Sequence, residues 1–129
     1  LETGGVSFLH LGDNRADWPA DVARAIGEVD VLLVTVDDSN HLLNYEEVDS
    51  LVRRLEPRVV IPMHYQIPGL TNDDTGLETP EGTLGTQPRV KRLEGPRVQF
   101  SPQSLPSQTE IWLFQPSPAS FASPPVGPL

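Results

Sequence analysis

Residues 31–36 read VLLVTV, and this unbroken apolar run decides the class of fold. A strand with one face in water alternates apolar and polar side chains, so a continuous run is typical of a strand covered on both faces, as in parallel sheets. A second run, RVVIPM, stands at residues 58–63. The two runs therefore predict strands of an α/β layered sheet with right-handed crossovers.

The segment between the two runs predicts a helix. Asn44 and Glu47 have the spacing of a capping box, which satisfies free amides where a helix begins. An apolar stripe follows at helical spacing, formed by Val48, Leu51, Val52 and Leu55. Pro57 is expected to end the helix, because proline cannot donate the next hydrogen bond.

The alternation of predicted strands and helices continues before residue 31 and after residue 63. Residues 5–11 predict a strand, and residues 19–26 predict a short helix that leaves through Gly27. Two further strands are predicted at residues 97–100 and 110–114, the first on its alternating pattern. A strand–helix–strand–helix–strand order with later strands is the pattern of one α/β domain.

Composition divides the chain into a domain and a tail. Residues 1–115 are expected to form one partial domain, in which residues 66–88 make a long acidic loop without Lys or Arg. Residues 116–129 are rich in Pro and Ser, so we expect a disordered tail.

Charge and composition exclude several classes of protein. The 129 residues carry 18 Asp and Glu against 9 Lys and Arg, for a net charge of −9. Such a surface repels phosphate, so no nucleic-acid or membrane partner is expected. The absence of cysteine excludes disulfides and thiolate zinc sites. Without a membrane span or a leader peptide in view, we expect a cytoplasmic protein.

Polar residues follow the predicted strands, where the carboxyl ends of parallel strands gather ligands. Asp13 follows the first strand, Asp37 and Asp38 the second, and His64 the third. Nitrogen and oxygen ligands together suit zinc, manganese or iron, so a metal site is the natural hypothesis. The alternative interpretation gives these residues no function: Asp13 forms a turn, the Asp37–Asp38 pair lies in a solvated loop, and His64 is a structural histidine. His41 is read as a loop residue without an assigned role.

Three stretches carry a family resemblance: residues 2–13 (ETGGVSFLHLGD), 29–33 (VDVLL) and 55–65 (LEPRVVIPMHY). Together they resemble the metallo-β-lactamase superfamily, and within it the L-ascorbate-6-phosphate lactonase-like branch of zinc-dependent hydrolases. Residues 104–106 and 110–113 are loosely similar to the last strand of that branch.

The resemblance implies an αββα sandwich with one or two metals at the rim between its sheets. The aspartate of the family's Gly-Asp pair is a metal ligand, and Asp13 matches it. The histidine after the Pro-Met strand is a ligand of the second metal, and His64 matches it. The metals of this family make hydroxide from a bound water near neutral pH, and zinc is the expected cofactor, with manganese or iron as alternatives.

The family's His-x-His-x-Asp-His cluster does not occur in the sequence. The chain therefore resembles the C-terminal portion of the domain, and a catalytic zinc site, which needs about three protein ligands, is expected to be incomplete in it. We expect a small-molecule substrate for the whole enzyme, and a homo-oligomer or the missing N-terminal half as partner of this chain.

Two other classes stay open. The first is a non-catalytic half-domain, whose uncovered sheet would expose a large apolar face and drive association. The second is a phosphoacceptor receiver domain, suggested by the acidic pair Asp37–Asp38. The position of Lys91, after a long loop instead of a strand end, argues against the receiver domain.

Overall fold

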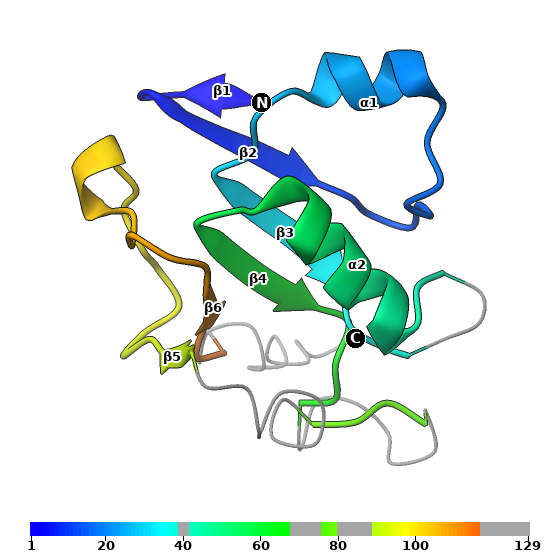
Figure 1. Ribbon diagram of the computed structural model, residues 1–129. Coiled ribbons are helices and arrows are strands. Elements are labelled where there is room, and N and C mark those ends of the chain that lie inside the picture. The colour runs from blue at the N-terminus through cyan, green and yellow to red at the C-terminus, as the bar shows by residue number, and fades with distance from the viewer. Residues whose placement is uncertain (39–41, 68–75, 80–88, 117–129) are drawn as a thin grey trace, which may run out of the picture.

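The computed structural model describes residues 1–38, 42–67, 76–79 and 89–116 (Figure 1). Its strands are β1 (Glu2–Thr3), β2 (Val6–His10), β3 (Val31–Thr35), β4 (Val59–Met63), β5 (Val90–Arg92) and β6 (Glu110–Leu113). Its helices are α1 (Ala20–Ile26) and α2 (Tyr45–Leu55), with one 3₁₀ turn, η2 (Pro102–Ser104).

The described strands form one sheet in the order β1-β2-β3-β4-β6-β5. β1 is antiparallel to β2, and every other neighbouring pair is parallel. β3 and β4 lie in the middle and pair from Val31↔Val59 to Thr35↔Met63. The prediction of a parallel α/β sheet from the two apolar runs is confirmed, and four of the five β3 side chains are buried.

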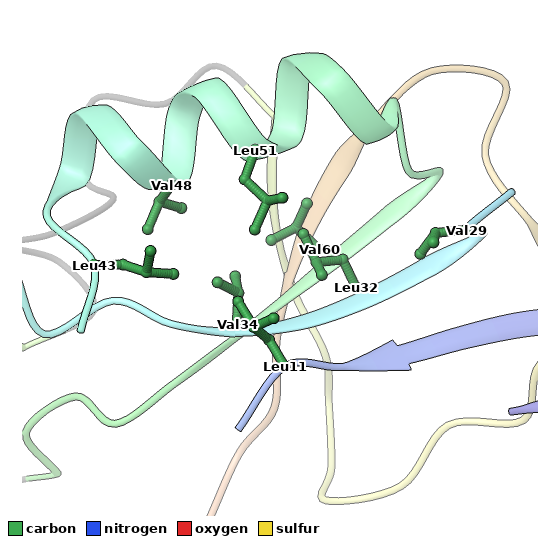
Figure 2. Close-up of a cluster of buried hydrophobic side chains, with 8 residues drawn as sticks. All are labelled: Leu11, Val29, Leu32, Val34, Leu43, Val48, Leu51 and Val60. Atoms are coloured by element: carbon green, nitrogen blue, oxygen red, sulfur yellow. The ribbon is translucent and has the colours of Figure 1, made fainter. Parts of the chain in front are cut away.

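Helix α2 covers one face of β3 and β4 (Figure 1). Its start is the predicted capping box: the Asn44 side chain accepts from the Glu47 amide, and the Glu47 carboxylate accepts from the Asn44 amide. Figure 2 shows two side chains of the predicted apolar stripe, Val48 and Leu51, pointing from the helix toward the sheet. The buried cluster there consists of Leu11, Val29, Leu32, Val34, Leu43, Val48, Leu51 and Val60.

Helix α1 lies beside β1 and β2 (Figure 1), and no residue of it is fully buried. It begins after Pro19 and ends at Ile26, before Gly27, whose positive φ of +65° is one that glycine adopts without strain. Both boundaries agree with the prediction for residues 19–26.

The opposite face of the sheet carries a second cluster around Trp112. Phe100 stacks on the Trp112 ring at 5.5 Å and meets Phe8 edge-on at 5.4 Å. The predicted strand at residues 97–100 is wrong: this segment forms no strand, and its alternation arises because Val98 and Phe100 pack onto the sheet as a cover.

The cover changes one expectation about the surface. The half-domain hypothesis anticipated a large apolar face, yet within the described ranges the exposed large hydrophobic side chains are Leu1 and Val22. Side chains such as Leu33 and Ile61 on the covered face are partly buried. None of the helices described is long and apolar enough to cross a membrane.

Two predicted segments lie mostly outside the part that the structure describes. Residues 68–75 and 80–88 of the expected acidic loop are among the undescribed residues, and so are residues 117–129 of the expected tail. Strand β5, just after the loop, was not predicted.

Candidate functional site

The carboxyl ends of β2, β3 and β4 lie side by side at one edge of the sheet (Figure 1). The Leu11 amide donates to the Leu33 carbonyl at 3.0 Å, and the Val36 amide donates to the Met63 carbonyl at 3.0 Å. The topology therefore brings three residues that follow these strands to a common rim: Asp13, Asp37 and His64. We call this edge the carboxyl rim.

Asp37 and His64 contact each other at the rim. The Nδ1 atom of His64 lies 2.8 Å from Oδ2 of Asp37. The Asp37 side chain is 5% exposed, whereas that of His64 is 54% exposed. A buried carboxylate thus holds an imidazole whose outer side reaches solvent.

The reading of Asp37 as part of an ordinary solvated loop is wrong, because this carboxylate is buried against His64. The contact joins residues 27 positions apart, and it depends on the register in which Thr35 lies opposite Met63. The available signal in the sequence was that each residue closely follows a strand made almost entirely of apolar residues.

The neighbouring Asp38 supports the backbone. Its Oδ1 atom accepts from the amide of Tyr45, the first residue of α2, at 3.0 Å. Asp38 and His64 have φ values of 51° and 59°, in the left-handed region that residues other than glycine seldom adopt. The chain therefore turns sharply just beyond the ends of β3 and β4.

Tyr45 faces these carboxylates from the first turn of α2. Burial raises the pKa of the Tyr45 phenol, and the negative charges of Asp38, Glu78 and Asp37 raise it further. Both effects disfavour the phenolate, so Tyr45 contributes a neutral phenol beside the rim.

Asp13 lies on the exposed loop that leaves β2. Gly12 before it has φ +59°, and the Asn14 side chain donates back to the Leu11 carbonyl at 2.7 Å. These features form a tight turn at the strand end. Among the described residues the Asp13 carboxylate makes no hydrogen bond or ion pair, so its oxygens are available to a ligand.

The rest of this loop is tied to α2. Arg54 donates to the Ala16 carbonyl at 3.0 Å and stacks over Trp18 at 4.6 Å from the ring centre. The Trp18 indole donates to the Arg15 carbonyl at 2.7 Å, and the Arg15 side chain donates to Glu47 at 3.0 Å. Arg15 is therefore a tether between loop and helix.

Thr35 adds an unusual polar atom near the rim. The residue is 3% exposed, and its Oγ1 atom has no hydrogen-bond partner in the part of the chain described. Buried hydroxyls almost always have a partner. By strand alternation Thr35 is on the face of β3 opposite α2, so its unsatisfied hydroxyl lies on that face near the rim.

The donors fit only part of a metal centre. Asp13 offers a carboxylate and His64 an imidazole, both of them types that zinc accepts. Within the described ranges, however, no group of three or more His, Cys, Asp or Glu side chains could hold a metal ion. His10 is exposed at the end of β2, and His41 lies outside the described residues.

Two surface hollows lie away from the rim residues. A hollow of about 850 Å³ is bordered by β1, β2, α1 and residues 27–30, and contains both exposed apolar side chains, Leu1 and Val22. A second hollow, of about 490 Å³, lies between the Arg15 loop and α2. Neither is lined by Asp13, Asp37 or His64.

Comparison with known proteins agrees with the architecture. Residues 1–64 match the family model described as a beta-lactamase superfamily domain. The match ends at His64 and includes both Asp13 and Asp37. No curated protein matches the chain significantly.

A solved structure from Thermotoga maritima has the same fold. It is described as that of a candidate Zn-dependent hydrolase of the metallo-beta-lactamase superfamily, and it is similar to this chain at 26% identity with a TM-score of 0.69. The similarity covers 88% of this chain and 55% of the other, so this chain spans about half the length of that structure. The predicted metallo-β-lactamase-like fold, present in part, is thereby confirmed.

Proposed function

We propose that this chain is part of a zinc-dependent hydrolase of the metallo-β-lactamase superfamily, in which Asp13 and His64 are two of the metal ligands. One observation carries the proposal: both residues follow parallel strands of one sheet at the same rim, within the segment that matches the superfamily. The Thermotoga structure, described as zinc-dependent, supports the choice of metal.

The remaining ligands would come from residues beyond this chain. A catalytic zinc site uses about three protein ligands and keeps one position open. The described residues provide no such group, and the sequence has no His-x-His-x-Asp-His cluster. We therefore expect no hydrolase activity from this polypeptide alone.

The finer resemblance suggests a branch. Residues 2–13 and 55–65 favour the L-ascorbate-6-phosphate lactonase-like group, which makes a small lactone or phosphoester the first substrate class to assay. We also place the protein in the cytoplasm, with a homo-oligomer or the N-terminal half of the domain as partner of this chain.

The DNA that precedes the codon of Leu1 provides the decisive experiment. The DNA upstream of Leu1 is expected to encode an in-frame His-x-His-x-Asp-His segment. The chain expressed together with that segment should bind stoichiometric zinc, or manganese or iron instead, and hydrolyse a lactone or phosphoester. Asp13→Asn and His64→Gln should each reduce metal binding and hydrolysis. The matched change Asp21→Asn, on the exposed helix α1, should reduce neither. The proposal would be contradicted if the upstream DNA lacked the cluster and translation started at the boundary of this chain.

A second candidate is a non-catalytic half-domain that docks onto another chain. The missing group of three ligands in the described residues favours it. Size-exclusion chromatography and metal analysis of the purified chain distinguish the two. A stable monomer that binds stoichiometric zinc would exclude the half-domain.

A further inference from the structure

We propose that Asp37 is the positioning residue for His64: it holds the imidazole proton on Nδ1 and leaves Nε2 as the bare nitrogen at the carboxyl rim. The 2.8 Å contact between Nδ1 and Oδ2 is the observation that carries the inference. A carboxylate accepts hydrogen bonds and has no proton to donate, so the shared proton belongs to Nδ1.

The burial of Asp37 distinguishes this contact from an ordinary surface pair. Exposed pairs are weakened by water and gain little. The Asp37 side chain is 5% exposed, so its oxygens interact in a medium of lower effective dielectric constant than water, where a charge-assisted hydrogen bond is stronger.

The backbone fixes both partners in place. The Val36 amide donates to the Met63 carbonyl at 3.0 Å, and Asp37 and His64 directly follow these two hydrogen-bonded residues. His64 then adopts φ +59°, a conformation that costs free energy for any residue with a Cβ. A rare backbone conformation is retained where neighbouring structure enforces it, and such positions concentrate at functional sites.

The consequence is an imidazole with one defined free atom. His64 is half exposed, and in the described part of the chain its Nε2 makes no hydrogen bond. Fixing one ring nitrogen through a carboxylate is how proteins orient histidines that bind metals or transfer protons. The use of Nε2 as a metal ligand rests on the proposed function, whereas the assignment of the proton does not.

Nitrogen-15 NMR of the labelled chain tests the assignment. Spectra are recorded at a pH high enough for the rings to be neutral, which the ¹⁵N shifts themselves report. His64 should show a protonated Nδ1 and a bare Nε2. His10, which has no hydrogen-bond partner among the described residues, is the internal reference and should show mainly the ordinary Nε2-protonated form.

Two substitutions assign the effect to one carboxylate. Asp37→Ala should return His64 to the pattern of His10. Asp38→Asn, one residue away, should leave His64 unchanged, because Asp38 bonds to the Tyr45 amide instead. If Asp37→Ala fails to fold, the ¹⁵N spectra of the wild type and of Asp38→Asn still test whether the His64 proton is on Nδ1. A wild-type His64 with its proton on Nε2, or an Asp37→Ala protein that keeps it on Nδ1, would overturn the proposal.

Addition of Zn²⁺ to the labelled chain expressed together with the upstream segment separates this inference from the proposed function. A shift of His64 Nε2 on addition of Zn²⁺ would support both. An unchanged Nε2 with the proton still on Nδ1 would contradict the metal-ligand role and leave Asp37 as the positioning residue.

Discussion

The guanidinium of Arg54 lies 4.6 Å from the centre of the Trp18 ring, and this contact joins the last turn of α2 to the loop that carries Asp13. The same guanidinium donates to the Ala16 carbonyl. One side chain near the end of the helix therefore restrains a loop that begins at the carboxyl rim, and Glu47 restrains it from the other end of the helix through Arg15.

Replacement of Arg54 tests this tether. Arg54→Ala loses a cation–π contact worth about 0.5–1 kcal/mol and a hydrogen bond worth about 0.5–1.5 kcal/mol. The free energy of unfolding, measured by urea denaturation, should fall by roughly 1–2 kcal/mol. Arg53→Ala is the matched control, since among the described residues Arg53 donates only to the Ser50 hydroxyl, at 3.4 Å. Equal losses in the two variants would show that the tether contributes nothing.

The start of α2 gives a second prediction. Asn44→Ala removes the side chain that accepts from the Glu47 amide, and loss of such a cap costs about 0.5–2 kcal/mol. Asn44→Asp keeps an acceptor at the same place and should retain most of the stability. Thermal unfolding of both variants provides the measurement. The capping box would have no energetic role if Asn44→Ala melted with the wild type.

Thr35 gives a prediction of the opposite sign. Thr35→Val keeps the branched shape and removes a buried hydroxyl that has no partner in the described residues. Removing an unsatisfied group should leave the free energy of unfolding unchanged or raise it by about 1 kcal/mol. Urea denaturation measures the change. A clear loss of stability would mean that the hydroxyl binds water or another polar group in solution.

The phenol of Tyr45 should titrate above its ordinary value. Its pKa is raised by burial and by nearby carboxylates, so the folded state favours the neutral phenol. The associated stability is complete below pH 10, the ordinary pKa of tyrosine, and is lost as the pH rises through the higher folded pKa. Ultraviolet titration of a Tyr65→Phe variant isolates Tyr45.

A matched substitution identifies one cause of that shift. Asp38→Asn removes one of these negative charges and should lower the pKa of Tyr45, while the new amide oxygen can still accept from the Tyr45 amide. A Tyr45 that ionises at or below pH 10 in the otherwise wild-type background would contradict the placement of these groups.

The sequence predicted most of the sheet because local signals and tertiary structure agree there. The apolar run at residues 31–36 and the Asn44–Glu47 spacing are recognisable without any knowledge of neighbours, and both became the expected elements. Strand β5 is only three residues long and contains two basic residues, so its place in the sheet comes from pairing with β6. The alternation at residues 97–100 arises because alternate side chains are buried against the sheet. A strand and an irregular covering segment both produce this pattern, so the sequence alone does not distinguish them.

The candidate site was predicted only in part for a related reason. Chain order and strand direction were enough to bring Asp13 and His64 to one edge. The Asp37–His64 contact additionally needs the register of β3 against β4, which a single sequence does not contain. The roles of Asp13 and His64 as metal ligands stay predictions.

The most direct test of the metal-binding rim is paramagnetic broadening by Mn²⁺ in the ¹⁵N-labelled chain. Amide resonances of residues 12–14, 37–38 and 63–65 should broaden first, and Asp13→Ala or His64→Ala should weaken the effect at all three segments together. Broadening centred instead on other acidic positions such as Glu2 and Glu28, with the three rim segments unaffected, would contradict the account.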